Sequence, residues 1–66
     1  MVFLSSSAIR SAEYDPNSNE LHITFTSGGS FTYFAVPAWK YAGLIAASSA
    51  GQYFNENIRD QHSSNR

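Results

Sequence analysis

The sequence of 66 residues contains no cysteine. Disulfide bonds and thiolate zinc sites are therefore excluded, so a domain of this size must be held together by its core. Absence of cysteine also favours a reducing compartment, and we expect a cytoplasmic protein. No apolar run approaches the ~20 residues that cross a membrane, and the N-terminal apolar segment is too short for a signal sequence. We therefore expect no membrane partner.

Charge is scarce as well. Charged residues make up 14% of the chain, with a formal net charge of −1, whereas typical domains carry about 25%. The four basic residues are scattered along the sequence, which provides little attraction to phosphates and little repulsion between copies. The charge pattern favours a homo-oligomer and counts against a partner bound mainly through phosphates.

Aromatic residues are abundant: five Phe, four Tyr and one Trp. A chain this short buries only about 60% of the surface that its unfolded form exposes. Each aromatic side chain buries about 150 to 250 Å², so most of them must lie in the core. We expect one domain that spans residues 1–66.

The spacing of apolar residues predicts three antiparallel strands. Residues 8–15 form the first, and the segment that begins Asp15-Pro16 is typical of a turn. In residues 20–26 apolar and polar side chains alternate, which predicts a half-buried second strand. Two glycines then lead into the third strand, residues 30–36.

Two short helices should follow the strands. Pro37 suits the first helical position because its φ angle is already helical. Ser49 and Gln52 fit a capping box at the start of a second helix, which should run to about Asp60. Residues 1–4 are expected to be an N-terminal extension, and residues 61–66, without an apolar anchor, a disordered tail. The predicted fold class is α+β: a three-stranded antiparallel meander followed by two short helices packed on one sheet face.

The register of the second hairpin decides which face carries Phe31 and Tyr33. A two-residue turn at Gly28-Gly29 places both on the face opposite Ile23 and Phe25, away from the helices. A three-residue loop with a glycine bulge reverses the faces and buries both aromatics. We favour the two-residue turn because it is the commoner connection.

A pattern of residues runs from Ser5 to Arg59: Ser5-Ser6, Ile9, Tyr14-Asp15, Leu21, Phe25, Gly28-Gly29, Phe31, Tyr33, Val36-Pro37, Tyr41, Leu44, Ser49, Gly51, Phe54-Asn55 and Ile58-Arg59. In this pattern the chain resembles the KTSC domain, a small module similar to the C-terminal extension of some lysyl-tRNA synthetases and found alone in small bacterial and phage proteins. The family has no established activity, and its fusion to a synthetase suggests RNA binding. Its central motif is Tyr-x-Tyr, whose first position here is Phe31, so one hydroxyl is lost and stacking is kept.

Catalytic and metal sites are not expected. The two histidines, His22 and His62, lack the close spacing of zinc ligands, and none of the eleven serines lies in a nucleophile-elbow pattern. Glu13 falls opposite His22 if the loop between them, Pro16 to Asn19, has four residues. Such a pair indicates a solvated cross-strand contact. We therefore expect no enzyme activity, no cofactor and no metal.

The predicted ligand-binding residues are Phe31, Tyr33 and Arg59. Exposed aromatics on a small sheet would bind RNA or a nucleotide by stacking. The alternative is a protein-interaction or self-assembly module, for which low charge and an exposed aromatic patch are typical. Trp39 either covers the sheet edge, which we favour in so small a chain, or binds a partner. A buried Tyr33 would leave only the second function, and only if Trp39 is exposed.

Overall fold

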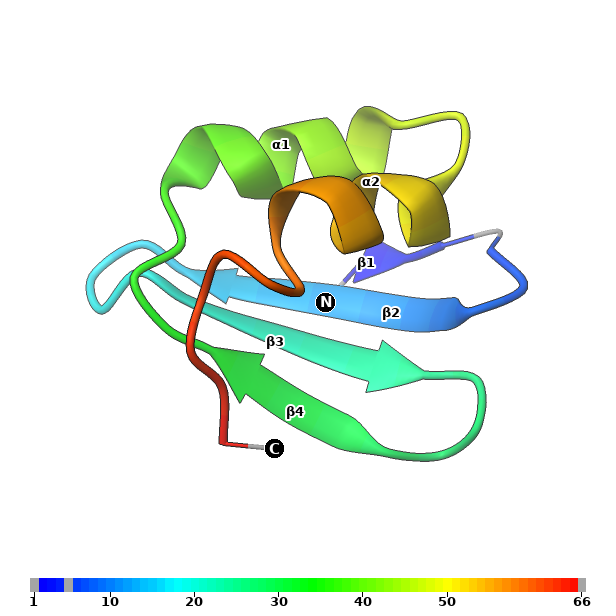
Figure 1. Ribbon diagram of the computed structural model, residues 1–66, viewed down its shortest axis with the longest axis horizontal. Coiled ribbons are helices and arrows are strands. Elements are labelled where there is room, and N and C mark those ends of the chain that lie inside the picture. Colours follow the sequence, from blue (N-terminus) through cyan, green and yellow to red (C-terminus); the bar gives the residue numbers. More distant parts are fainter. Residues whose placement is uncertain (1, 5, 66) are drawn as a thin grey trace.

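The computed structural model describes residues 2–4 and 6–65, in which two helices cover one face of an antiparallel sheet (Figure 1). The elements in chain order are β1 (Val2–Phe3), β2 (Ile9–Asp15), β3 (Glu20–Phe25), β4 (Ser30–Tyr33), α1 (Ala38–Ala46) and α2 (Ala50–Asn57). The strands lie in the order β1-β2-β3-β4. The α+β class is therefore confirmed, but the sheet has four strands, not three. The additional strand arises because Val2 and Phe3, expected to belong to an extension, pair with β2.

The hairpin between β2 and β3 forms as the sequence predicts. The carboxylate of Asp15 accepts a hydrogen bond from the backbone N–H of Asn17 at 2.9 Å. The loop has four residues, and Glu13 lies opposite His22. Asp15 and Asn17 thus hold the turn through a local side-chain contact that the residue types alone indicate.

Within β2, the pairing with β3 shifts by one residue between Ile9 and Ser11. This irregularity lets Ile9 and Ala12, three positions apart, both lie buried under the helices. A strict alternation would have placed them on opposite faces.

The β3–β4 hairpin has the register that the sequence analysis disfavours. Leu21 pairs with Tyr33, and Ile23 pairs with Phe31. A two-residue turn at the glycines would instead have set Ile23 opposite Phe34. The predicted register is therefore wrong, and Phe31 and Tyr33 lie on the same face as Leu21 and Ile23, under the helices.

A three-residue loop produces this register. The backbone N–H of Phe25 donates to the carbonyl of Gly29 at 2.8 Å, and three residues lie between them. Gly28, the last of the three, has a φ of 104°. Glycine adopts this conformation without the steric penalty that a Cβ atom brings, which is typical of a glycine bulge.

The core lies between the helices and the sheet. Its buried apolar members are Ile9, Ala12, Leu21, Ile23, Tyr33, Val36, Leu44, Ala50, Phe54 and Ile58. The ring of Phe54, from α2, makes edge contacts with Phe25 and Tyr33 at centroid distances of 5.4 and 5.2 Å. Such tilted contacts stabilise aromatic pairs beyond their area burial.

The helix starts lie close to the predicted positions. Pro37, predicted as the first helical residue, is the N-cap of α1, so α1 begins one position later than predicted, and α2 ends at Asn57, short of the predicted end near Asp60. The hydroxyl of Ser49 accepts a hydrogen bond from the backbone N–H of Gln52 at 3.3 Å, as expected for an N-cap. The side-chain amide of Gln52 donates to Glu56 at 3.2 Å instead of reaching back to Ser49, so only the serine half of the predicted capping box forms. No helix in residues 2–4 and 6–65 is long and apolar enough to cross a membrane.

Residues 61–65, expected to be disordered, lie along β4 (Figure 1). The backbone N–H of Phe34 donates to Ser63 at 2.9 Å, and that of Asn65 donates to Thr32 at 3.1 Å. The side-chain oxygen of Asn65 also accepts from the N–H of Thr32 at 2.8 Å. Hydrogen bonds to an edge strand thus replace the apolar anchor that the segment lacks. Residue 66 of the predicted tail lies outside the described residues.

Candidate interaction surface

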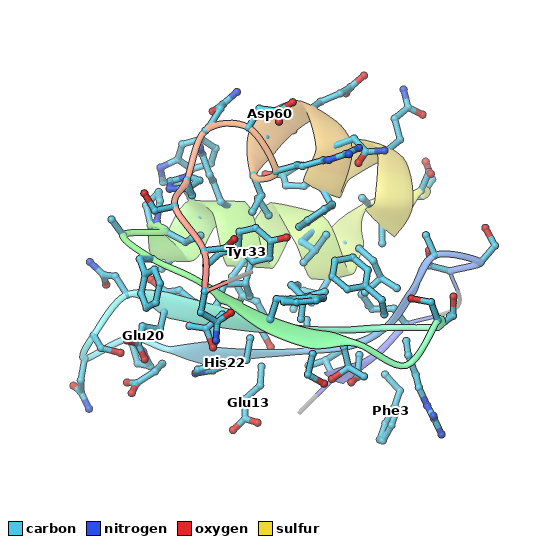
Figure 2. All side chains as sticks on the ribbon, turned by 60° about the horizontal axis from the view of Figure 1, so that its bottom comes forward. Phe3, Glu13, Glu20, His22, Tyr33 and Asp60 are labelled. Atoms are coloured by element: carbon cyan, nitrogen blue, oxygen red, sulfur yellow. The ribbon has the colours of Figure 1, made fainter. Side chains whose placement is uncertain are left out.

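The structure does not bring the predicted ligand-binding residues together on one exposed surface. Tyr33 is 2% exposed, and Figure 2 shows it on the helix side of the sheet, away from Glu13 and His22. Phe31 is half-buried and contacts Phe25 at a centroid distance of 5.8 Å. A ring enclosed like that of Tyr33 cannot stack on a base. The expected aromatic sheet platform is therefore wrong, because the three-residue loop reversed the faces.

Arg59 lies beyond the end of α2, where it is exposed. It lines a small pocket of about 200 Å³ together with Phe25 and Phe54. Phe25 contacts Phe31, and Phe54 contacts Tyr33. Arg59 therefore lies at the edge of the aromatic core, whereas Tyr33 is buried within it.

The sheet face that the helices leave open is polar. His22 shares a hydrogen bond of 2.7 Å with the hydroxyl of Thr32, and its other ring nitrogen lies 3.9 Å from the Glu20 carboxylate. Glu13, opposite His22, is exposed on this face (Figure 2). Nowhere in the described part of the chain do three His, Asp or Glu side chains gather as a metal site would require. His22 is a strand-surface residue.

Apolar residues that are exposed, apart from the half-buried Pro37, lie where β4 passes into α1. We call this region the junction surface: Phe34, Ala35, Pro37, Ala38 and Trp39. Trp39 is 63% exposed and Phe34 38% exposed, and the five residues carry no charge. The sequence-based preference for Trp39 as a cover of the sheet edge is therefore wrong.

The conformation of the chain around Val36 explains this exposure. Val36 is fully buried, its N–H donates to Asn19 at 2.9 Å, and its carbonyl accepts from the Tyr14 hydroxyl at 2.6 Å. Ala35, just before it, has a φ of 56°, which L-residues other than Asn and Asp adopt at a cost. The chain therefore changes direction after Tyr33, and Phe34 lies outside the core.

Lys40 is buried behind the junction surface, with 7% of the residue exposed. Its ammonium donates to the carbonyl of Asn57 at 2.8 Å, the amide oxygen of Gln61 at 2.9 Å and Nε2 of His62 at 2.8 Å. An ammonium has three donors, so these three acceptors use all of them. The cluster joins α1 to the end of α2 and to the tail, and the ammonium lies 5.5 Å from the centroid of the Trp39 ring.

The imidazole of His62 must be neutral to accept this hydrogen bond. Burial lowers the pKa of His62, and the charge of Lys40 lowers it further, whereas a backbone hydrogen bond with Phe34 acts in the opposite direction. A neutral His62 and a charged Lys40 are therefore mutually consistent. The sequence offers no signal for this cluster, because Lys40 is separated by 17 to 22 positions from its acceptors.

Comparison with known proteins places this geometry in a family. The model of the KTSC domain family matches residues 5–62. An uncharacterised protein from Stutzerimonas stutzeri is 41% identical over 61 residues, which cover 92% of this chain and 86% of the relative. A protein from Tsukamurella paurometabola is 40% identical over 56 residues, covering 85% and 84% of the two chains.

Two further similarities bear on the fold and its context. The crystal structure of a KTSC domain protein from Yersinia pestis superimposes with a TM-score of 0.93 at 31% identity, over 97% of this chain and 90% of that one. A lysine–tRNA ligase from Nostoc is 38% identical over 55 residues, which are 83% of this chain but only 10% of the ligase. Similar sequences thus occur both as small proteins and as a minor part of a large enzyme.

Proposed function

The chain belongs to the KTSC domain family, and we propose that it is a non-enzymatic binding module whose partner is a protein bound at the junction surface. The observation that carries the proposal is the exposure of Trp39, 63% of which is open to solvent. Tryptophan is among the residues that contribute most strongly to protein–protein interfaces when an interface buries them. Exposed apolar residues that lie together mark interaction sites more often than single ones do, and Phe34 and Ala38 are exposed close to Trp39 in the sequence.

The rigid support of the junction surface is a second argument. The backbone N–H and carbonyl of Val36 are both hydrogen-bonded, to Asn19 and to the Tyr14 hydroxyl, and the Lys40 ammonium has three acceptors. Side chains on a surface that is already ordered lose less conformational freedom on binding. Trp39 and Phe34 are therefore suited to present apolar area to a partner at low entropic cost.

The basic residues favour a protein partner over RNA. Lys40 is buried and committed to its three acceptors, which removes it from any phosphate-binding track. Arg10 and Arg59 remain as exposed cations in the described residues. Two such cations supply little of the phosphate contact on which affinity for RNA depends. Burial of Tyr33 also removes the predicted stacking surface.

The ligase relative is compatible with this proposal. A segment that makes up a tenth of a synthetase and also resembles a free-standing protein must carry its binding surface within its own fold. A docking role fits both contexts, because a domain of this size can add a partner without altering a distant active site.

The test compares the wild-type chain with Trp39→Ser and, as a matched surface control, Arg59→Ser. Each is immobilised and exposed to an extract of the source cells, before and after treatment with ribonuclease. We expect a protein retained by the wild type and by Arg59→Ser, insensitive to ribonuclease and lost with Trp39→Ser. Retention of RNA by all three, or loss only with Arg59→Ser, would contradict the proposal. Circular dichroism confirms that the variants are folded.

A further inference from the structure

We propose that β1 is a self-association edge, at which a second copy of the chain pairs with the first in antiparallel orientation. This inference concerns the opposite edge of the sheet from the tail and does not depend on the junction surface. It specifies where the self-association suggested by the low charge takes place.

The hydrogen-bond pattern leaves the backbone groups of Phe3 pointing outward. The N–H of Leu4 donates to the carbonyl of Arg10 at 2.9 Å, and Val2 lies opposite Ala12. In an antiparallel ladder, hydrogen-bonded and non-hydrogen-bonded positions alternate, so Phe3 occupies the position whose N–H and C=O face away from β2. Within the described residues no backbone hydrogen bond from a loop, turn or the tail reaches these two groups.

The two edges of the sheet differ in how they are covered. At β4, residues 63–65 bond to the outward backbone groups. At β1 the described residues provide no such cover. Natural edge strands are commonly protected by charged side chains, proline or bulges, and Val2, Phe3 and Leu4 offer neither charge nor proline. The β1 edge is therefore open to a further strand.

The side chains at this edge are apolar on both faces of the sheet. Phe3 is 73% exposed on the open face, where Figure 2 shows it apart from the helices. On the helix side, Val2 and Leu4 line a groove of about 610 Å³ together with Ile45, which is exposed. The other lining residues are Phe3, serines and alanines, and none of the lining residues is charged.

A second copy fits this edge for reasons of symmetry. An antiparallel strand edge is complementary to itself about a two-fold axis. With the axis at Phe3, each Phe3 N–H donates to the Phe3 carbonyl of the other copy, and the two exposed rings meet on the open face. Val2 of each copy then approaches the groove of the other, and the uncharged lining produces no repulsion.

The dimer should be weak. Stable interfaces bury roughly 1,200 to 2,000 Å² in total, and an edge of two paired residues with its neighbouring groove covers less. We therefore expect association that becomes visible only between micromolar and millimolar concentrations, as a rise in average mass in sedimentation equilibrium. Amide chemical shifts should change on dilution at Phe3 and its neighbours.

Phe3→Pro is the sharpest test. The N–H of Phe3 faces away from β2, so proline at this position removes the outward donor without removing a hydrogen bond within the chain. The extended conformation of Val2 is compatible with a following proline. We expect association to weaken by about tenfold or more, the equivalent of ~1.4 kcal/mol. Phe3→Glu, which keeps the backbone donor and adds repulsion between copies, should weaken it as well and serves if the proline variant fails to fold.

Trp39→Ser is the control that separates this inference from the proposed function. Dimerisation should be unchanged in Trp39→Ser, even though that variant loses the protein partner. A constant monomer mass up to millimolar concentration would overturn the inference, as would a folded Phe3→Glu variant that associates like the wild type. Association lost in Trp39→Ser but kept in the Phe3 variants would show that copies meet at the junction surface, which also overturns it.

Discussion

Replacing Tyr33 with phenylalanine should stabilise the protein. The hydroxyl oxygen of Tyr33 is buried and has no hydrogen-bond partner among the described residues. A buried hydroxyl without a partner costs about 1 to 3 kcal/mol relative to its hydrated state in the unfolded chain. Tyr33→Phe removes that hydroxyl and leaves the ring, with its edge contact to Phe54 at 5.2 Å, in place.

The expected gain in the free energy of unfolding is about 1 kcal/mol, the lower end of that range, because a small void replaces the oxygen. For a chain of 66 residues this corresponds to a rise in the melting temperature of about 4 to 8 °C. Urea unfolding followed by circular dichroism should show a higher midpoint with an unchanged slope, since the surface exposed on unfolding does not change.

Tyr33→Ala provides the matched comparison. It removes the ring and should destabilise the fold by about 3 to 5 kcal/mol, which would leave most of so small a domain unfolded. The reasoning is refuted if Tyr33→Phe lowers the melting temperature by several degrees, because the hydroxyl would then make a hydrogen bond that stabilises the folded state. It is also refuted if Tyr33→Ala unfolds at the wild-type temperature, since Tyr33 could not then be a core residue.

Three further changes test other parts of the structure. Ala35→Gly should leave stability unchanged or raise it by up to about 1 kcal/mol, because relief of the positive φ outweighs the added chain entropy, whereas Ala35→Val should lower the melting temperature. The free energy of unfolding should fall as the pH drops below 6.5, which is the pKa of His62 in the unfolded chain. The pKa of His62 is lower in the folded state, so the unfolded chain binds more protons in this range. A His62→Gln variant whose stability kept the same pH dependence would exclude this cause. Lys40→Met should free the tail, which hydrogen exchange would detect as faster exchange of the Phe34 amide; unchanged protection would show that the β4 pairing alone holds it.

Local residue patterns determined much of this fold. The alternation in residues 20–26 predicts β3, the Asp15-Pro16 turn predicts the first hairpin, and Ser49 predicts the start of α2; all three appear in the structure. Each depends on contacts between residues a few positions apart, so the sequence contains the whole interaction.

The candidate site depended on a choice that local patterns leave open. Two-residue and three-residue loops at the glycines differ little in their own energy, yet a change of one residue in register moves every side chain of β4 to the other face. Packing of Tyr33 and Phe31 near Phe54 and Phe25 favours the three-residue loop. That packing requires α2 to be in place over the sheet, so it belongs to the tertiary structure.

The features on which both proposals depend also arise from the tertiary structure. The strand at Val2 and Phe3 is too short to show a period, and the tail has no apolar residue to mark its place. The acceptors of Lys40 lie at the end of α2 and in the tail. Amino-acid types thus determined the elements and most of the core, because these follow from local conformation and hydrophobicity. Which aromatics are exposed was decided only by tertiary structure, because exposure depends on hydrogen bonds and packing between residues distant in the sequence.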